Sequence, residues 1–218
     1  MKTRGSLPGA LICAIVLSLF GIRQSLSVQP KDASKSQEFH EAGAVAASAR
    51  QHPVDTQKST LTVRVYKAGI FSALGHDHEI AAPIASGAVD AATARVELHM
   101  KAGELRVRDP NVSEKDRAAI QQTMLGPEVL DVERDPEIVF RSVGAEPMGA
   151  GSWRLRGDLT LHGQTRPVTV EVKDTGGHYV GTSRLKQTDF GIKPVKVAGG
   201  TVRVKDEIRI EFDIQMAH

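Results

Sequence analysis

The second half of the chain alternates apolar and polar residues in one run after another. Trp153, Leu155 and Leu159 share one parity, and polar residues occupy the positions between them. The same alternation runs through residues 168–172 and 208–214. Because successive side chains of a strand point to opposite faces, each run has one apolar face and one polar face. Such strands build an antiparallel barrel or a two-sheet sandwich, and a barrel interior can hold an apolar ligand.

Turn and capping signals divide the rest of the pattern into about eight strands and one helix. Ser113 is placed to cap a helix that ends at Gly126-Pro127. Short connections between the strands predict an antiparallel meander. The expected strands are 60–67, a stretch broken at Pro83 that reaches Val89, 94–101, a stretch that follows Pro136, 152–161, 166–173, 178–186 and 201–215.

Residues 1–27 have the layout of a secretory signal peptide. Lys2 and Arg4 precede an apolar run from Ala10 to Phe20, and small residues flank a cleavage point at 25–27. That run is too short for a comfortable membrane span. We therefore expect export to the periplasm or secretion, with no stable membrane span in the mature chain.

The remaining chain divides into a linker and a domain. Residues 28–51 are rich in Ala, Ser, Gln and Lys and lack a long apolar period, which predicts a linker or a loosely helical lead-in. Residues 52–218 have the size of one domain with a substantial core.

Charge and cysteine content exclude several classes of function. Residues 1–27 hold three of the 28 basic residues and none of the 26 acidic ones, so the mature chain has a formal charge of −1. This balance gives no support for nucleic-acid binding. The one cysteine, Cys13, lies in the signal segment, which excludes disulfides and cysteine-ligated zinc from the domain. The chain also lacks a nucleophile elbow, a P-loop and a dinucleotide fingerprint.

Several segments in a fixed order resemble one known family. They are Val54-Asp55 and Ser59 before the first strand, AGIFS at 68–72, LDVERDPEIVFRS at 130–142, GDLTLHGQTRPV at 157–168 and TDFGI at 188–192. Together they resemble the YceI-like family of exported, lipocalin-like proteins that bind polyisoprenoids and other long-chain lipids. The resemblance covers nearly all of residues 52–218.

The resemblance implies an all-β fold, an antiparallel lipocalin-like β-barrel of about eight strands with a short helical insert. It also implies non-catalytic binding of an isoprenoid chain in an apolar tunnel, with the polar head nearer the opening. Burial of each methylene contributes roughly 0.8 kcal/mol, so a long chain binds without a catalytic group or a cofactor. We expect no cofactor and no enzymatic activity.

Parity and the resemblance together supply candidate ligand-binding residues. The alternative for each is ordinary packing against its neighbours in a solid core. The candidates are Val63, Val65, Ile70, Phe71, Val96, Leu98, Met100, Phe140, Leu155, Leu159 and Leu161, together with His76 and His78.

The two histidines also suggest a different class of function. On an extended segment His76 and His78 share a face, so both rings could reach one metal ion. Many family members instead carry a histidine just after the first strand, where this chain has Lys67. Two histidines without a third ligand are a weak zinc signal, so we favour a polar turn or mouth lining and assign no metal site.

Three functions therefore stay open from the sequence. The first is an exported lipid or polyisoprenoid binder. The second is a metal-binding protein or metal-dependent enzyme that uses His76 and His78, and the third is a solidly packed interaction module. The sequence leaves the monomer and the homodimer open, although a closed barrel has few free edges.

Overall fold

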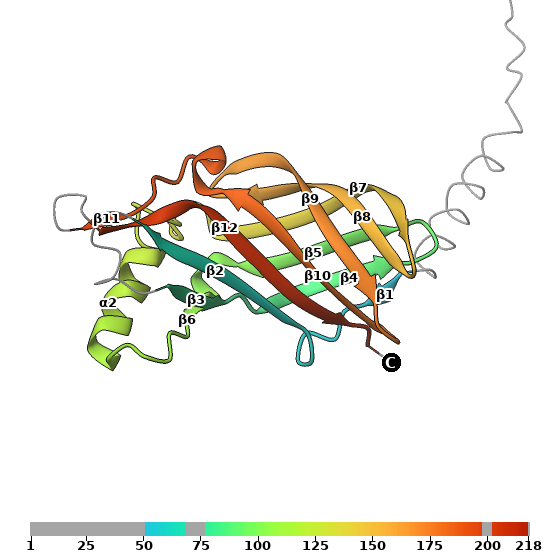
Figure 1. Cartoon of the computed structure of the whole chain (residues 1–218), viewed down its shortest axis with the longest axis horizontal. Helices are drawn as coiled ribbons and strands as arrows, with labels where there is room; N and C mark the ends of the chain where they lie inside the picture. The colour runs from blue at the N-terminus through green and yellow to red at the C-terminus, as the bar shows by residue number, and fades with distance from the viewer. Residues whose placement is uncertain (1–50, 69–76, 198–201, 218) are drawn as a thin grey trace, which may run out of the picture. The chain divides into compact units, whose positions relative to one another are not determined.

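The computed structural model describes residues 51–68, 77–197 and 202–217. The described residues form twelve strands of one antiparallel sheet and one α-helix, α2 (Figure 1). The elements are β1 His52–Pro53, β2 Thr60–Ala68, β3 His78–Ala81, β4 Ile84–Asp90, β5 Arg95–Lys101, η2 Ala102–Glu104, β6 Arg106–Val107, α2 Glu114–Leu125, β7 Glu137–Gly149, β8 Ser152–Leu161, β9 Gln164–Asp174, β10 His178–Lys186, η3 Gln187–Phe190, β11 Lys196–Val197 and β12 Val202–Gln215.

The sheet curls round until the first and last strands of the chain, β1 and β12, come together. β2 pairs with β12 on one side and with β3 on the other, while β1 pairs with β4. Beyond β1, the Asp55 amide donates to Gln215 O at 2.8 Å, and the Ala217 amide donates to Pro53 O at 2.8 Å. These contacts join the start of the sheet to the end of β12. The predicted antiparallel, lipocalin-like β-barrel with a short helical insert is confirmed.

The predicted number of strands, about eight, is wrong: the described residues contain twelve. Pro83 has no amide hydrogen and divides one expected strand into β3 and β4. A turn at residues 56–58 separates β1 from β2. The two-residue strands β6 and β11 are too short for alternation to reveal.

The helix forms where the capping signal placed it. Ser113 Oγ accepts a hydrogen bond from the Asp116 amide at 3.1 Å at the start of α2. The Gly126 amide donates to Gln122 O at 3.0 Å at the other end. The expected end at Gly126-Pro127 is confirmed.

The barrel has two ends that differ in structure. At one, which we call the helix end, lie α2, η3 and the β8–β9 turn (Figure 1). At the other, which we call the turn end, lie the β4–β5, β7–β8 and β9–β10 turns. The β8–β9 turn consists of His162 and Gly163, whose φ angles of 50° and 65° suit a tight two-residue hairpin.

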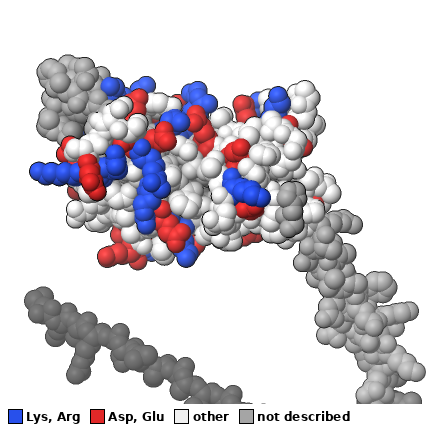
Figure 2. Space-filling view, turned by 90° about the horizontal axis from the view of Figure 1, so that it is seen from below, with Lys and Arg blue, Asp and Glu red and all other residues white. Residues whose placement is uncertain are grey.

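The outer face of the barrel carries charges of both signs in alternation. Figure 2 shows Lys and Arg side chains next to Asp and Glu side chains over the face in view, without a broad patch of one sign. Several pairs join neighbouring strands, such as Arg154–Glu171 at 3.6 Å and Arg184–Glu207 at 3.1 Å. This face offers no extended basic surface for a nucleic acid. None of the helices in the described part of the chain is long and apolar enough to cross a membrane.

Some predictions fall on residues that the structure does not describe. These are the signal peptide at 1–27, the linker at 28–51 apart from residue 51, and the candidate residues Ile70, Phe71 and His76. The boundaries of the predicted domain, 52–218, stay predictions.

Candidate ligand-binding cavity

The barrel encloses a cavity of about 270 Å³. Its wall is built from the inward faces of the strands, and α2 and the segment after it contribute Met124, Val129 and Leu130. The described lining residues include no Asp, Glu, Lys, Arg or His. The interior is therefore an uncharged, almost wholly apolar space that excludes ions.

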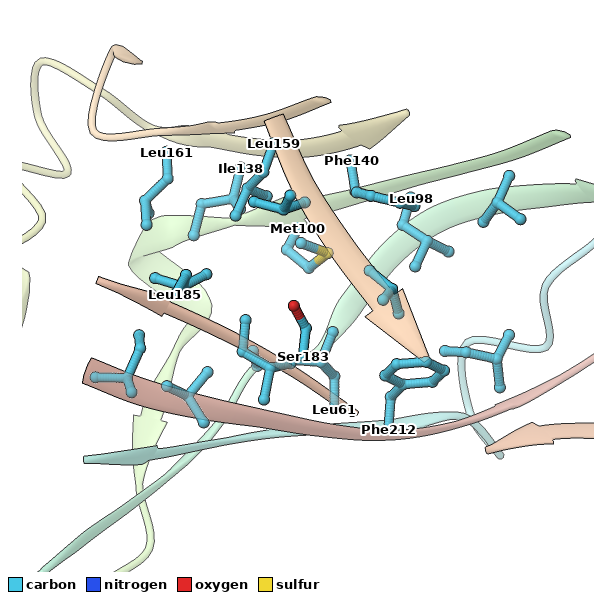
Figure 3. Close-up of a pocket in the computed structure, with 18 of the residues that line it drawn as sticks. Leu61, Leu98, Met100, Ile138, Phe140, Leu159, Leu161, Ser183, Leu185 and Phe212 are labelled. Carbon is cyan, nitrogen blue, oxygen red and sulfur yellow. The ribbon is translucent and has the colours of Figure 1, made fainter. Parts of the chain in front are cut away.

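The described apolar candidates line this cavity. Cross-strand pairing explains their arrangement, because Leu98 pairs with Phe140, which in turn pairs with Leu159 across β5, β7 and β8 (Figure 3). Whether they contact a ligand stays a prediction. The candidates in the wall are Val63, Val65, Val96, Leu98, Met100, Phe140, Leu155, Leu159 and Leu161.

Glycines in the wall let large side chains of neighbouring strands pack against bare backbone. At Gly181 a Cβ would lie 2.6 Å from Phe212 Cζ, and at Gly87 it would lie 2.7 Å from Leu98 Cδ2. Both are closer than Cβ atoms approach in real structures. The ring of Phe212 thus packs against bare backbone and occupies the space that a side chain at residue 181 would need.

The two ends of the cavity differ in accessibility. At the turn end, Ala91 is exposed, and Ala94, Trp153, Val172 and Tyr179 are half-buried. Among the described lining residues towards the helix end, Leu105, Leu130 and Ile192 are 5%, 7% and 4% exposed, and Val129 is half-buried. Among the described lining residues, those at the turn end are therefore the more exposed.

Four lining residues with polar groups were not among the candidates. Trp153 and Tyr179 lie at the turn end, and Ser183 and Gln187 lie deeper. Sequence reasoning placed Trp153 on the apolar parity without making it a candidate, and it passed over Tyr179, Ser183 and Gln187 because it grouped inward residues by apolarity. Tyr179 and Ser183 share the parity of Leu185 on β10, which was a signal that could have identified them. Gln187 continues that parity into η3.

His78 lies outside the cavity lining. It belongs to a separate polar pocket of about 340 Å³, together with Arg64, Lys67 and Asp77. His78 Nδ1 lies 2.7 Å from Oδ2 of Asp109, which is 1% exposed and also accepts the Glu79 amide at 2.7 Å. The histidine thus contacts a buried carboxylate rather than the mouth of the cavity.

The described residues contain one cluster with the donor types of a metal site. Ligand atoms of Asp131, Asp135 and His162 lie within 4.8 Å of one another. Arg134 forms ion pairs with both carboxylates, at 3.5 Å to Asp131 and 3.1 Å to Asp135. This guanidinium offsets part of the negative charge of the acidic pair, and His162 Nδ1 lies 3.1 Å from Phe190 O. The cluster is explained as an anchor for the β8–β9 turn.

Comparison with known proteins identifies the family. The model of the YceI-like domain matches residues 53–216, which include every described strand but residue His52 of β1. The chain belongs to the YceI-like family. The YceI-like segments predicted from the sequence, from Val54 to Ile192, all fall within this match.

Relatives of this YceI-like chain share part of its length. A UPF0312 protein of Vibrio cholerae is 29% identical over 118 residues, which cover 50% of this chain and 58% of the relative. A UPF0312 protein of Pseudomonas syringae pv. tomato is 38% identical over 96 residues, covering 39% and 44%. The chain thus spans about half the length of the curated relatives it matches.

A solved structure shares the YceI-like fold of this chain. The crystal structure of Burkholderia cenocepacia BcnA superposes with a TM-score of 0.57 at 20% identity. The match covers 76% of this chain and 99% of BcnA. It supports the barrel architecture derived above.

Proposed function

We propose that this protein binds a lipid or polyisoprenoid chain, without catalysis, in the interior of its barrel. The observation that carries the proposal is the uncharged cavity of about 270 Å³ within a continuous antiparallel wall. Membership of the YceI-like family supports the same function.

The affinity would come from the hydrophobic effect. Each buried methylene contributes roughly 0.8 kcal/mol, so a chain of many methylene and methyl groups gains enough to offset the cost of association. A polar or charged solute would lose its hydration in this cavity without compensation. The cavity thus favours an apolar chain over a small polar ligand.

Lipid extraction tests the proposal. Protein purified without detergent is extracted with organic solvent, and mass spectrometry identifies what is released. We expect a long-chain lipid near equimolar amounts, and we expect added polyprenol to raise the melting temperature of the delipidated protein. Absence of any lipid together with an unchanged melting temperature contradicts the proposal.

We also propose that the protein acts outside the cytoplasm. This rests on the signal-like residues 1–27. Fractionation of a Gram-negative host followed by N-terminal sequencing tests it. A shortened protein in the periplasm or the medium is expected, and an uncleaved cytoplasmic protein contradicts export.

A further inference from the structure

Two polar side chains lie deep in the apolar cavity. Ser183 and Gln187 line it and are each 7% exposed. They share the inward parity with Leu185, because β10 leads directly into η3. Figure 3 shows the Ser183 hydroxyl among apolar side chains, directed towards Met100.

Both side chains donate a hydrogen bond to a backbone carbonyl oxygen. Ser183 Oγ donates to Thr169 O at 2.7 Å, and Gln187 Nε2 donates to Lys205 O at 2.8 Å. The carbonyl partner also fixes the orientation of the Gln187 amide, since the atom facing it must be nitrogen. What remains on these two residues is acceptor capacity at Ser183 Oγ and Gln187 Oε1, together with the second hydrogen of Gln187 Nε2.

Comparison with Gln121 shows that the side-chain oxygen of Gln187 lacks the kind of hydrogen-bond partner that Gln121 has within the described part of the chain. Gln121 Nε2 donates to Leu105 O, and its Oε1 accepts the Val107 amide, both at 2.8 Å. Within the described part of the chain, Gln187 Oε1 has no such partner. Among these residues only Arg117 Nε is sealed from solvent and unpaired, so Gln187 Oε1 has access to open volume. Gln187 is one of the residues that line the cavity.

A hydrogen-bond acceptor in such a cavity favours ligands that carry a donor group. A buried acceptor left unpaired is costly, whereas a hydroxyl that donates to it restores the hydrogen bond. An ammonium or guanidinium group also donates, but the uncharged wall provides nothing to balance its charge. An ester or ether oxygen can accept the second hydrogen of Gln187 Nε2 but has no hydrogen to give, so it leaves Oε1 unpaired, whereas a hydroxyl can satisfy either atom.

We propose that Gln187 recognises a hydroxyl group on the ligand, with Ser183 as a second acceptor nearer the turn end. The preferred ligand is then an uncharged long-chain alcohol that enters hydroxyl first from the more exposed turn end and leaves its chain along the apolar wall. This rests on the proposed lipid-binding function and reverses the expectation of a polar head near the opening.

A matched pair of probes tests this recognition. Binding of octadecan-1-ol and of its methyl ether to delipidated protein is measured by competition with a fluorescent fatty probe. The two differ in the donor hydrogen and one methyl group. We expect the alcohol to bind about tenfold more tightly, as one hydrogen bond of ordinary net strength provides. Equal affinities of the wild type for the two probes, or tighter binding of the ether, overturn the proposal without measurements on any variant.

Variants then assign the preference to Gln187. In Gln187→Met the alcohol and the ether should bind equally, while Gln121→Met, which loses a similar amide outside the cavity, should keep the tenfold ratio. If the alcohol still binds about tenfold more tightly than the ether in Gln187→Met, the preference does not come from Gln187. If neither probe binds the wild type, the proposed lipid-binding function fails, which is a different outcome from equal binding of both.

Discussion

The ring of Phe140 lies against Gly157 on the neighbouring strand so closely that no side chain could fit between them. A Cβ at residue 157 would lie 2.5 Å from Phe140 Cε2 and 2.6 Å from the backbone oxygen of Arg141. This contact holds a large aromatic ring, 8% exposed, along the wall of the cavity. The position of the Phe140 ring in the cavity wall thus depends on the glycine at residue 157.

Gly157→Ala should destabilise the protein. The new methyl group must displace both the Phe140 ring and the Arg141 carbonyl, and overpacking of this kind costs about 1–3 kcal/mol. Urea denaturation measures the loss. Gly103→Ala is the matched control, because a Cβ there meets nothing within 4 Å. Equal stability of the two variants would show that the Phe140 contact is easily relieved.

Leu155→Trp should block the cavity. Leu155 is 7% exposed and faces the interior from β8, so an indole at this position occupies the space of a ligand chain. We expect the rise in melting temperature on addition of polyprenol to disappear, with a loss of stability of about 1–3 kcal/mol. Val143→Trp places the same ring on the outer surface, where Val143 is 68% exposed, and should respond to polyprenol like the wild type. A normal response in Leu155→Trp places the ligand elsewhere.

Asp109→Ala should destabilise the helix end. The carboxylate accepts the Glu79 amide and contacts His78 Nδ1, both at 2.7 Å, and thereby ties the segment after β6 to β3. Hydrogen bonds to a buried charged group contribute about 1.5–3 kcal/mol each. The loss should exceed that of Asp213→Ala, which removes a half-exposed pair with His178 worth about 0–1 kcal/mol. Comparable losses measured by chemical denaturation would argue against a tie at Asp109.

Glu97 should titrate below its ordinary range. Its hydrogen bond with His99 and its pairing with Arg141 lower the pKa of the Glu97 carboxyl from the ordinary value of 4.5. Because the folded pKa is the lower one, the stability from this pair is present above 4.5 and is lost as the pH falls through the folded pKa. NMR titration should show this pKa rising towards its ordinary value in His99→Ala. No change in that variant would leave Arg141 as the main cause.

The inward face of the barrel was predictable from the sequence because alternation is a local property. Leu155 and Leu159 lie on the same parity of one strand, and the structure places both in the cavity wall. The helix was predictable for the same reason, since Ser113 and Asp116 are three residues apart. Each of these features depends on neighbours along the chain.

Features that depend on distant residues were not predictable. Asp109 contacts His78 across 31 positions, and nothing in the sequence links the two. The orientation of the Gln187 amide depends on the backbone carbonyl of Lys205, 18 positions away. The register shift in the pairing of β12 with β2, between Val204 and Ile208, likewise involves two segments far apart in the sequence.

Trp153 provides the most direct test of the central claim, that a lipid chain occupies the cavity. It is the one tryptophan of the chain and lines the cavity at the turn end. Titration with a polyprenol brominated along its chain should quench Trp153 fluorescence saturably at one equivalent, and excess unbrominated polyprenol should restore it. Fluorescence that is unchanged by the brominated chain at saturating concentration would contradict the account.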